Sequence, residues 1–183
     1  MEDKELIQKY LEGNDEAFQT LVKRYLSPIY NFVFSSVRDK HHAEDITQDV
    51  FIKVWTHLKR YDPSKSFKVW IYTIAKNSVY DFLRKKKDIP FSFLEKEGEL
   101  FDIPDSEPLP DKILQLSDSS KTMDAALSKL AIPYREVLIL YYQNGFNFRE
   151  IAEIFKTSAN TVKSRHRRAL VMLKKIFKKP DPP

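Results

Sequence analysis

The chain has 183 residues, of which 42% are hydrophobic, and it carries a net charge of +5. This hydrophobic content allows packed cores and argues against global disorder. The absence of cysteine excludes disulfides, thiolate metal sites and thiol catalysis. The longest apolar run, residues 137–142, is far too short for a membrane span, and the residues after Met1 do not form a signal peptide. We therefore expect a cytoplasmic protein without direct membrane insertion.

Apolar residues recur at helical spacing along almost the whole chain, and strand-like alternation is nowhere sustained. This pattern predicts an all-α protein. The charge is unevenly distributed, with a net charge of +4 over residues 1–87, −6 over residues 88–121 and +7 over residues 122–183. Two basic blocks separated by an acidic one indicate two nucleic-acid surfaces joined by a different kind of segment.

The first residues predict three short helices that build a core. The first helix covers Lys4–Leu11 and ends at Gly13, and Asn14 caps the second. Pro28 suits the first turn of a third helix, because proline is favoured there.

The segment Ala43–Leu58 predicts a helix with one apolar and one polar face. Its core stripe consists of Ile46, Val50, Val54 and Leu58, widened by Phe51 and Trp55. The exposed side carries Asp45, Gln48, Asp49 and Lys53. Judged by its pattern alone, such a face is usually just solvated.

A loop over Lys59–Ser66, interrupted by Pro63, leads into a long helix that begins at Phe67. We expect Phe67, Trp70, Ile71, Ile74 and Phe82 to face a core, and Lys68, Lys76, Asn77, Arg84 and Lys85 to remain outside. Basic residues interleaved with aromatics suit a single nucleic-acid strand, since bases stack on rings while cations follow the phosphates. A core helix with a lysine-rich end fits the pattern equally well.

Residues 88–121 predict a linker. They are acidic, lack a sustained period and contain four of the ten prolines. A structureless stretch of this length is unusual inside one compact domain, so it predicts two small helical domains, residues 1–87 and 122–183, joined by a long acidic linker.

The second domain begins with a helix whose apolar face includes Met123, Leu127 and Leu130. Pro133 fits the first turn of the next helix, and Gly145 can end it.

Residues 147–173 predict a helix-turn-helix. Asn147 and Glu150 form a capping box, Lys156 and Thr157 occupy the turn, and Ser158 caps the second helix. In that helix Val162, His166, Ala169 and Leu173 are predicted to face inward. The outer side and its flanks carry four basic residues and no acid within residues 160–168, which is typical of a helix that enters the DNA major groove. The predicted DNA contacts are Asn160, Thr161, Lys163, Ser164, Arg165, Arg167 and Arg168.

The strings REIAEIF, TSANTVKSR and RRAL resemble the promoter-reading module of bacterial sigma factors, and LSKLAIPYREVLILYYQNGFNF resembles the two helices before it. AEDITQDVFIKVWTHL and FKVWIYTIAKNSVYDFLRKKK resemble the polymerase-docking and −10 segments of the same family. The chain is therefore identified as a member of the extracytoplasmic-function (group 4) sigma factors. The resemblance implies that it binds core RNA polymerase and promoter DNA, reads the −35 and −10 elements and promotes strand opening.

The resemblance also implies roles for individual residues. Asp45, Gln48, Asp49 and Lys53 would dock on a coiled coil of the largest polymerase subunit. The loop from Tyr61 to Phe67 would hold a flipped base, and the −10 set becomes Tyr61, Asp62, Ser64, Lys65, Ser66, Phe67, Trp70, Lys76 and Asn77. Family members are commonly held inactive by an anti-sigma factor, so such a partner is expected as well.

Catalytic residues are not predicted, and neither a metal site nor a cofactor site is. His41 and His42 lack a third ligand at a sensible spacing, and glycine-rich phosphate loops do not occur. The main alternative is a stand-alone helix-turn-helix regulator that dimerises on a palindromic operator. A DNA-processing enzyme is a third hypothesis, without a catalytic set to support it. The sequence departs from the family pattern at Lys156 in the turn, at His166 and at Leu170.

Overall fold

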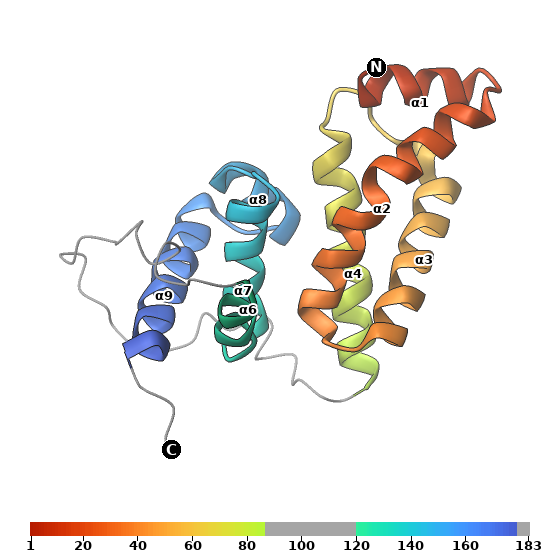
Figure 1. Cartoon of the computed structure of the whole chain (residues 1–183). Helices are drawn as coiled ribbons and strands as arrows, with labels where there is room; N and C mark the ends of the chain where they lie inside the picture. Colours follow the sequence, from red (N-terminus) through yellow and green to blue (C-terminus); the bar gives the residue numbers. More distant parts are fainter. Residues whose placement is uncertain (87–119, 179–183) are drawn as a thin grey trace. The chain divides into compact units, whose positions relative to one another are not determined.

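The computed structural model describes residues 1–86 and 120–178, and its helices form two units (Figure 1). Every regular element in these residues is a helix, which confirms the predicted all-α class. The first unit contains α1 (Asp3–Leu11), α2 (Asp15–Val37), α3 (Lys40–His57), the 3-10 turn η1 (Leu58–Arg60) and α4 (Phe67–Lys85). The second contains α6 (Ser120–Ser128), α7 (Ile132–Leu138), η3 (Ile139–Gln143), α8 (Phe148–Phe155) and α9 (Ala159–Lys178).

Most of the predicted linker, residues 88–121, lies outside the described residues. Helix α6 begins at Ser120, so the last two residues assigned to the linker are helical.

In the first unit α2, α3 and α4 pack side by side, and α1 packs against α2 (Figure 1). Phe32 of α2 and Tyr72 of α4 meet edge to face in the centre, with ring centroids 5.5 Å apart. The predicted caps are present: Gly13 has a φ of 101°, and the Asn14 side chain accepts from the amide of Ala17.

The prediction that Pro28 starts a third helix is wrong, because α2 continues through it from Asp15 to Val37. Proline inside a helix costs about 3 kcal/mol. The buried face nevertheless keeps its spacing across the proline, with Tyr25 and Ile29 on either side and Phe32 beyond. Burying each such side chain contributes about 1.5–3 kcal/mol, so packing on both sides of Pro28 outweighs the cost.

The prediction that Trp55 widens the core stripe of α3 is also wrong. The predicted stripe of Ile46, Val50, Val54 and Leu58 is buried, but Trp55 is 58% exposed. Nine residues separate Trp55 from Ile46, which is about two and a half helical turns, so the two side chains lie on opposite sides of the helix. Ile52 is 60% exposed on the same outer side.

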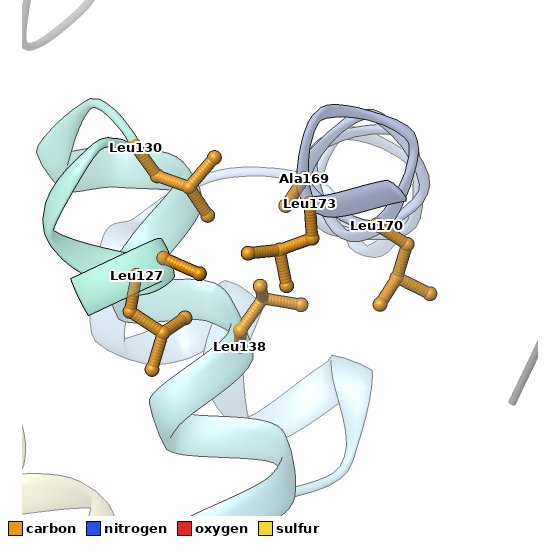
Figure 2. Packing of buried hydrophobic residues seen from close by; sticks show 7 residues of the cluster. Leu127, Leu130, Leu138, Ala169, Leu170 and Leu173 are labelled. Carbon is orange, nitrogen blue, oxygen red and sulfur yellow. The ribbon is translucent and has the colours of Figure 1, made fainter. Parts of the chain in front are cut away.

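One hydrophobic cluster of the second unit is formed by α6, α7 and α9, and α8 adds the buried Ile151 and Ile154 to the interior. In Figure 2, Leu130 and Leu138 point toward Leu173 of α9. The buried Arg135 donates to the carbonyls of Leu127 and Leu130, at 2.9 and 2.8 Å, and so satisfies the end of α6. As predicted, Pro133 lies in the first turn of α7, and Gly145, with a φ of 67°, follows the π-helical turn η3. No helix in the described parts of the chain is long and apolar enough to cross a membrane.

Candidate functional site

The helix-turn-helix forms as the sequence predicts. The amide of Asn147 donates to the Glu150 carboxylate at 2.8 Å, and the Asn147 side chain accepts from the amide of Glu150 at 3.1 Å. Ser158 accepts from the amide of Thr161 at 3.0 Å and so caps α9. These local bonds fix the two helix starts without help from distant residues.

Lys156 occupies the turn in the left-handed region, with a φ of 52°. A side chain at this conformation costs on the order of 1 kcal/mol, which glycine would avoid. The left-handed conformation of Lys156 therefore lowers stability relative to glycine at this position.

Helix α9 separates an inner from an outer side. Val162, His166, Ala169 and Leu173 are buried, as predicted. The hydroxyl of Tyr142 lies 3.2 Å from His166 Nε2, and the rings of Tyr141 and Phe148 pack against the imidazole. An inward histidine is therefore accommodated by a polar partner and by ring contacts.

The predicted DNA-contact residues lie on the remaining surface of α9. Asn160, Lys163 and Ser164 are exposed, and Thr161, Arg165, Arg167 and Arg168 are half-buried. The whole helix contains seven basic residues and no acidic residue. A helix with a buried inner side and a basic outer side is typical of an element that binds nucleic acid.

The outer face of α3 presents Asp45, Gln48 and Asp49, all of them exposed. Lys53 is engaged within the unit, because its ammonium lies 2.6 Å from the Asp49 carboxylate and 2.8 Å from the Ser78 hydroxyl of α4. Sequence reasoning missed Ile52 and Trp55, which continue this face toward the end of α3. Their angular position relative to the core stripe could have identified them.

The loop before α4 has a fixed internal structure. The Asp62 carboxylate accepts from the amide of Ser64 at 2.9 Å, and hydrogen bonds from Ser64 lower the pKa of Asp62. The Tyr61 hydroxyl donates to the Lys65 carbonyl, and burial raises the pKa of Tyr61. Asp62, Ser64, Lys65 and Ser66 are exposed, whereas Tyr61 and Phe67 are buried at 8% and 3% exposure.

On α4, Asn77 is exposed and Trp70 is half-buried. The Trp70 ring lies 5.1 Å from that of Tyr61 and 5.7 Å from that of Phe67. The prediction that Lys76 remains outside is wrong, because it is 9% exposed. Its aliphatic stem packs along the unit while its ammonium lies over the Tyr80 ring, 5.0 Å from the centroid.

Comparison with known proteins decides the family. Residues 21–89 match Sigma-70 region 2, and residues 120–173 match Sigma-70 region 4. The chain is 32% identical to the ECF RNA polymerase sigma factor SigM of Bacillus subtilis (strain 168) over 164 residues, covering 89% of this chain and 94% of that protein. The chain belongs to the extracytoplasmic-function (ECF) sigma factors. SigX of the same organism is 31% identical to this sigma factor over 162 residues, covering 88% and 84% of the two chains.

Solved structures agree with the fold of this sigma factor. CnrH in complex with the cytosolic domain of CnrY has a TM-score of 0.69 and 24% identity, with 96% of both chains covered. The sigma factor RpoE in complex with the anti-sigma factor NepR from Bartonella quintana has a TM-score of 0.67 and 25% identity, covering 88% of this chain and 96% of that one. Region 2 spans most of α2 together with α3 and α4, and region 4 spans α6 through most of α9.

Proposed function

We propose that this sigma factor divides promoter recognition among three surfaces: the outer face of α3 for core RNA polymerase, α9 for the −35 element, and the loop and face of α4 for the −10 element. One observation carries the proposal. Both sigma regions are present in order, and each presents an exposed face with the chemistry that its role requires.

The polymerase surface combines charge with apolar area. Asp45, Gln48 and Asp49 supply acceptors and donors, while Ile52 and Trp55 supply exposed apolar area next to them. Large aromatic side chains carry much of the binding energy at protein interfaces, and charges beside them set orientation and association rate. The role of Lys53 is then to hold Asp49 in place through the bridge to Ser78.

The duplex surface is α9. Arg167, Arg168 and Asn160 have the side chains that read guanine and adenine edges, and Lys163 and Arg165 can neutralise phosphates. The buried inner face fixes the helix, so the outer residues are held in position before DNA binds.

The −10 surface lies in the first unit. Opening DNA exchanges base stacking for contacts with protein, so the protein must favour the single strand. Asp62, Ser64, Lys65, Ser66 and Asn77 offer exposed polar groups for this, and the half-buried Trp70 offers an aromatic ring. Tyr61 and Phe67 are buried and support the loop from the interior of the unit. Lys76 is buried at the edge of the −10 surface.

We place RNA synthesis in the polymerase and assign this chain specificity and strand opening, in the cytoplasm where promoters are transcribed. An anti-sigma factor as a further partner is supported by RpoE, whose structure was determined with NepR. A pull-down from stressed and unstressed cells that recovers polymerase alone would argue against such a partner.

Binding of core polymerase to an α3 variant tests the polymerase surface. Asp45→Lys/Trp55→Ala changes two exposed side chains on the outer face of α3 and leaves the Asp49–Lys53 bridge intact. We expect affinity for core polymerase to fall at least about tenfold, with an unchanged melting temperature. Glu16→Lys is the matched control, since it reverses an exposed charge on α2. Equal affinities of the two variants would refute the assignment of this face.

A further inference from the structure

Asp3 at the start of α1 bonds to α2 through both of its carboxylate oxygens. Oδ1 accepts from the guanidinium of Arg24, and Oδ2 accepts from the hydroxyl of Tyr25. Arg24 also donates to the carbonyl of Met1, at 2.9 Å. Two neighbouring residues of α2 therefore hold a single carboxylate of α1 in place.

The Tyr25 hydroxyl remains a donor to this carboxylate. Burial raises the pKa of Tyr25, and the hydrogen bond to Asp3 raises it further. Tyr25 is 7% exposed, and the side chain of Asp3 is 22% exposed. A hydrogen bond to a charged group in a place largely shielded from water is stronger than one between neutral groups at the surface. This bond fixes the position of the Tyr25 ring.

The Tyr25 ring packs against the first residue of α4. Its centroid lies 5.3 Å from that of Phe67, and the two rings meet edge to face. Phe67 in turn meets the Tyr61 ring edge to face, with centroids 5.7 Å apart. The Tyr61 hydroxyl donates to the Lys65 carbonyl. Tyr61 and Phe67 are the two ends of the loop assigned to the −10 strand, so Tyr25 supports this loop from the interior.

Asp3 also acts on the loop through its charge. Burial raises the pKa of Tyr61, and the negative charge of Asp3 adds to this rise. The contacts form an unbroken series in which Asp3 bonds to Tyr25, Tyr25 packs on Phe67, and Phe67 packs on Tyr61. Because protein interiors are close-packed, a shift of one ring displaces the rings next to it.

We propose that Asp3 is a positioning residue for the −10 loop, which it holds in place through Tyr25. The inference rests on the proposed −10 role of the first unit. Asp3 acts through the rings of Phe67 and Tyr61 and needs no contact with DNA. Its effect is that the exposed loop residues already have their binding conformation when the promoter strand arrives, which reduces the entropy lost on binding.

A purely structural role of Asp3 makes a different prediction, and the chain offers a matched control. Helix α1 is also held by the buried Leu6 and Ile7, and a capping box joins Glu2 and Glu5 at its start. Glu5→Ala removes this capping box at an exposed position and leaves the Asp3–Tyr25 bond intact. Asp3→Ala and Glu5→Ala therefore both weaken the start of α1, but only Asp3→Ala releases Tyr25.

The test uses holoenzyme assembled from core polymerase and the full chain, and a labelled single strand with the non-template −10 sequence of a promoter that it transcribes. Asp3→Ala, Tyr25→Phe, the double variant and Glu5→Ala are compared with wild type. Tyr25→Phe keeps the ring that packs on Phe67 and removes only the hydroxyl that donates to Asp3. Urea unfolding followed by tryptophan fluorescence measures the stability of the first unit in each variant, since both tryptophans lie there.

We expect Asp3→Ala and Tyr25→Phe each to weaken binding of the strand about tenfold, within the range of about two- to thirtyfold for residues that act on a site through others. The double variant should bind within about twofold of either single variant, because both changes break the same link. Glu5→Ala should bind within about twofold of wild type although it lowers stability. Binding to core polymerase and to a −35 duplex should be unchanged in all four variants.

Two results overturn the positioning role of Asp3 while wild-type holoenzyme still prefers the −10 strand to a scrambled one. The first is wild-type affinity of Tyr25→Phe for the strand, whatever the effect of Asp3→Ala. The second is an equal loss of affinity in Glu5→Ala and Asp3→Ala. If wild-type holoenzyme binds the scrambled strand equally well, the proposed −10 role fails and the positioning role with it.

Discussion

The two units differ in how they combine packing with binding. In the second unit, the side chains that pack α9 and those assigned to DNA lie on different sides of the same helix. In the first unit, single side chains serve both purposes: Trp70 contacts core rings and lines a pocket, and Asp49 is bonded to Lys53 on an outward face. Substitutions at binding residues of the second unit should therefore change DNA binding with little effect on stability. Substitutions at binding residues of the first unit should change both binding and stability.

The largest expected effect is a loss of stability in the first unit, where packing and binding share side chains. Phe67→Ala removes a buried ring that contacts Tyr25, Tyr61 and Trp70, and should destabilise this unit by about 3–5 kcal/mol. Both tryptophans lie in the first unit, so denaturant unfolding followed by tryptophan fluorescence reports on it directly. Tyr61→Phe, which removes only a hydroxyl, should cost about 1 kcal/mol. If Phe67→Ala lowered stability by less than about 1 kcal/mol, the view that packing and binding are coupled in this unit would be contradicted.

The second unit should behave in the opposite way. Arg167→Ala and Arg168→Ala should weaken binding of holoenzyme by about 1–3 kcal/mol at particular −35 base pairs. Stability should change by no more than about 0.5 kcal/mol for Arg168→Ala. The change should be larger for Arg167→Ala, because the Nε atom of Arg167 is buried. Competition between duplexes with single base-pair changes measures the preference. If both variants keep the wild-type preference, the placement of α9 in the groove is wrong.

These differences explain which features were predictable from the sequence. The capping box at Asn147 and the inward positions of α9 follow from local spacing, and all were predicted. Trp55 was misplaced although its angle within α3, opposite Ile46, follows from the helical spacing. Lys76 was misplaced because its burial depends on how α4 packs in the unit, and its ammonium lies over the ring of Tyr80, one turn further along the same helix.

Other features of the first unit could not be predicted from local sequence patterns. Pro28 is a local signal for a helix start, but the packing of Tyr25, Ile29 and Phe32 against the rest of the unit overrides it. A pocket between α3 and α4 joins Arg60 to Asn77, and a sequence pattern within one helix cannot show such a pairing.

A smaller effect concerns Arg38 and Lys156, the two non-glycine residues with a left-handed backbone in the described parts of the chain. Lys156→Gly should raise stability by at most about 1 kcal/mol, because glycine adopts this conformation without strain. Arg38→Gly should gain less, since it also removes the hydrogen bond from Arg38 Nε to the Ser35 carbonyl. Thermal unfolding followed by circular dichroism measures both changes. A lower melting temperature for Lys156→Gly would show that its side chain makes a stabilising contact.

The smallest expected effect is at the end of α9, which extends to Lys178 and so carries Lys174, Lys175 and Lys178 in its last two turns. Lys175→Ala should weaken binding to all promoter duplexes alike. The slope of log affinity against log salt concentration should fall by about 0.9, the value for one phosphate contact. A change in base preference would instead place Lys175 among the residues that read sequence.

Transcription from a randomised promoter library by core polymerase with and without this chain tests the division of labour most directly. We predict transcripts that depend on the chain and share two separate sequence blocks at a fixed spacing. Arg168→Ala should relax the upstream block alone, and Asn77→Ala the downstream block alone. Transcripts that do not depend on the chain, or a single palindromic block, would contradict the account and favour a stand-alone regulator.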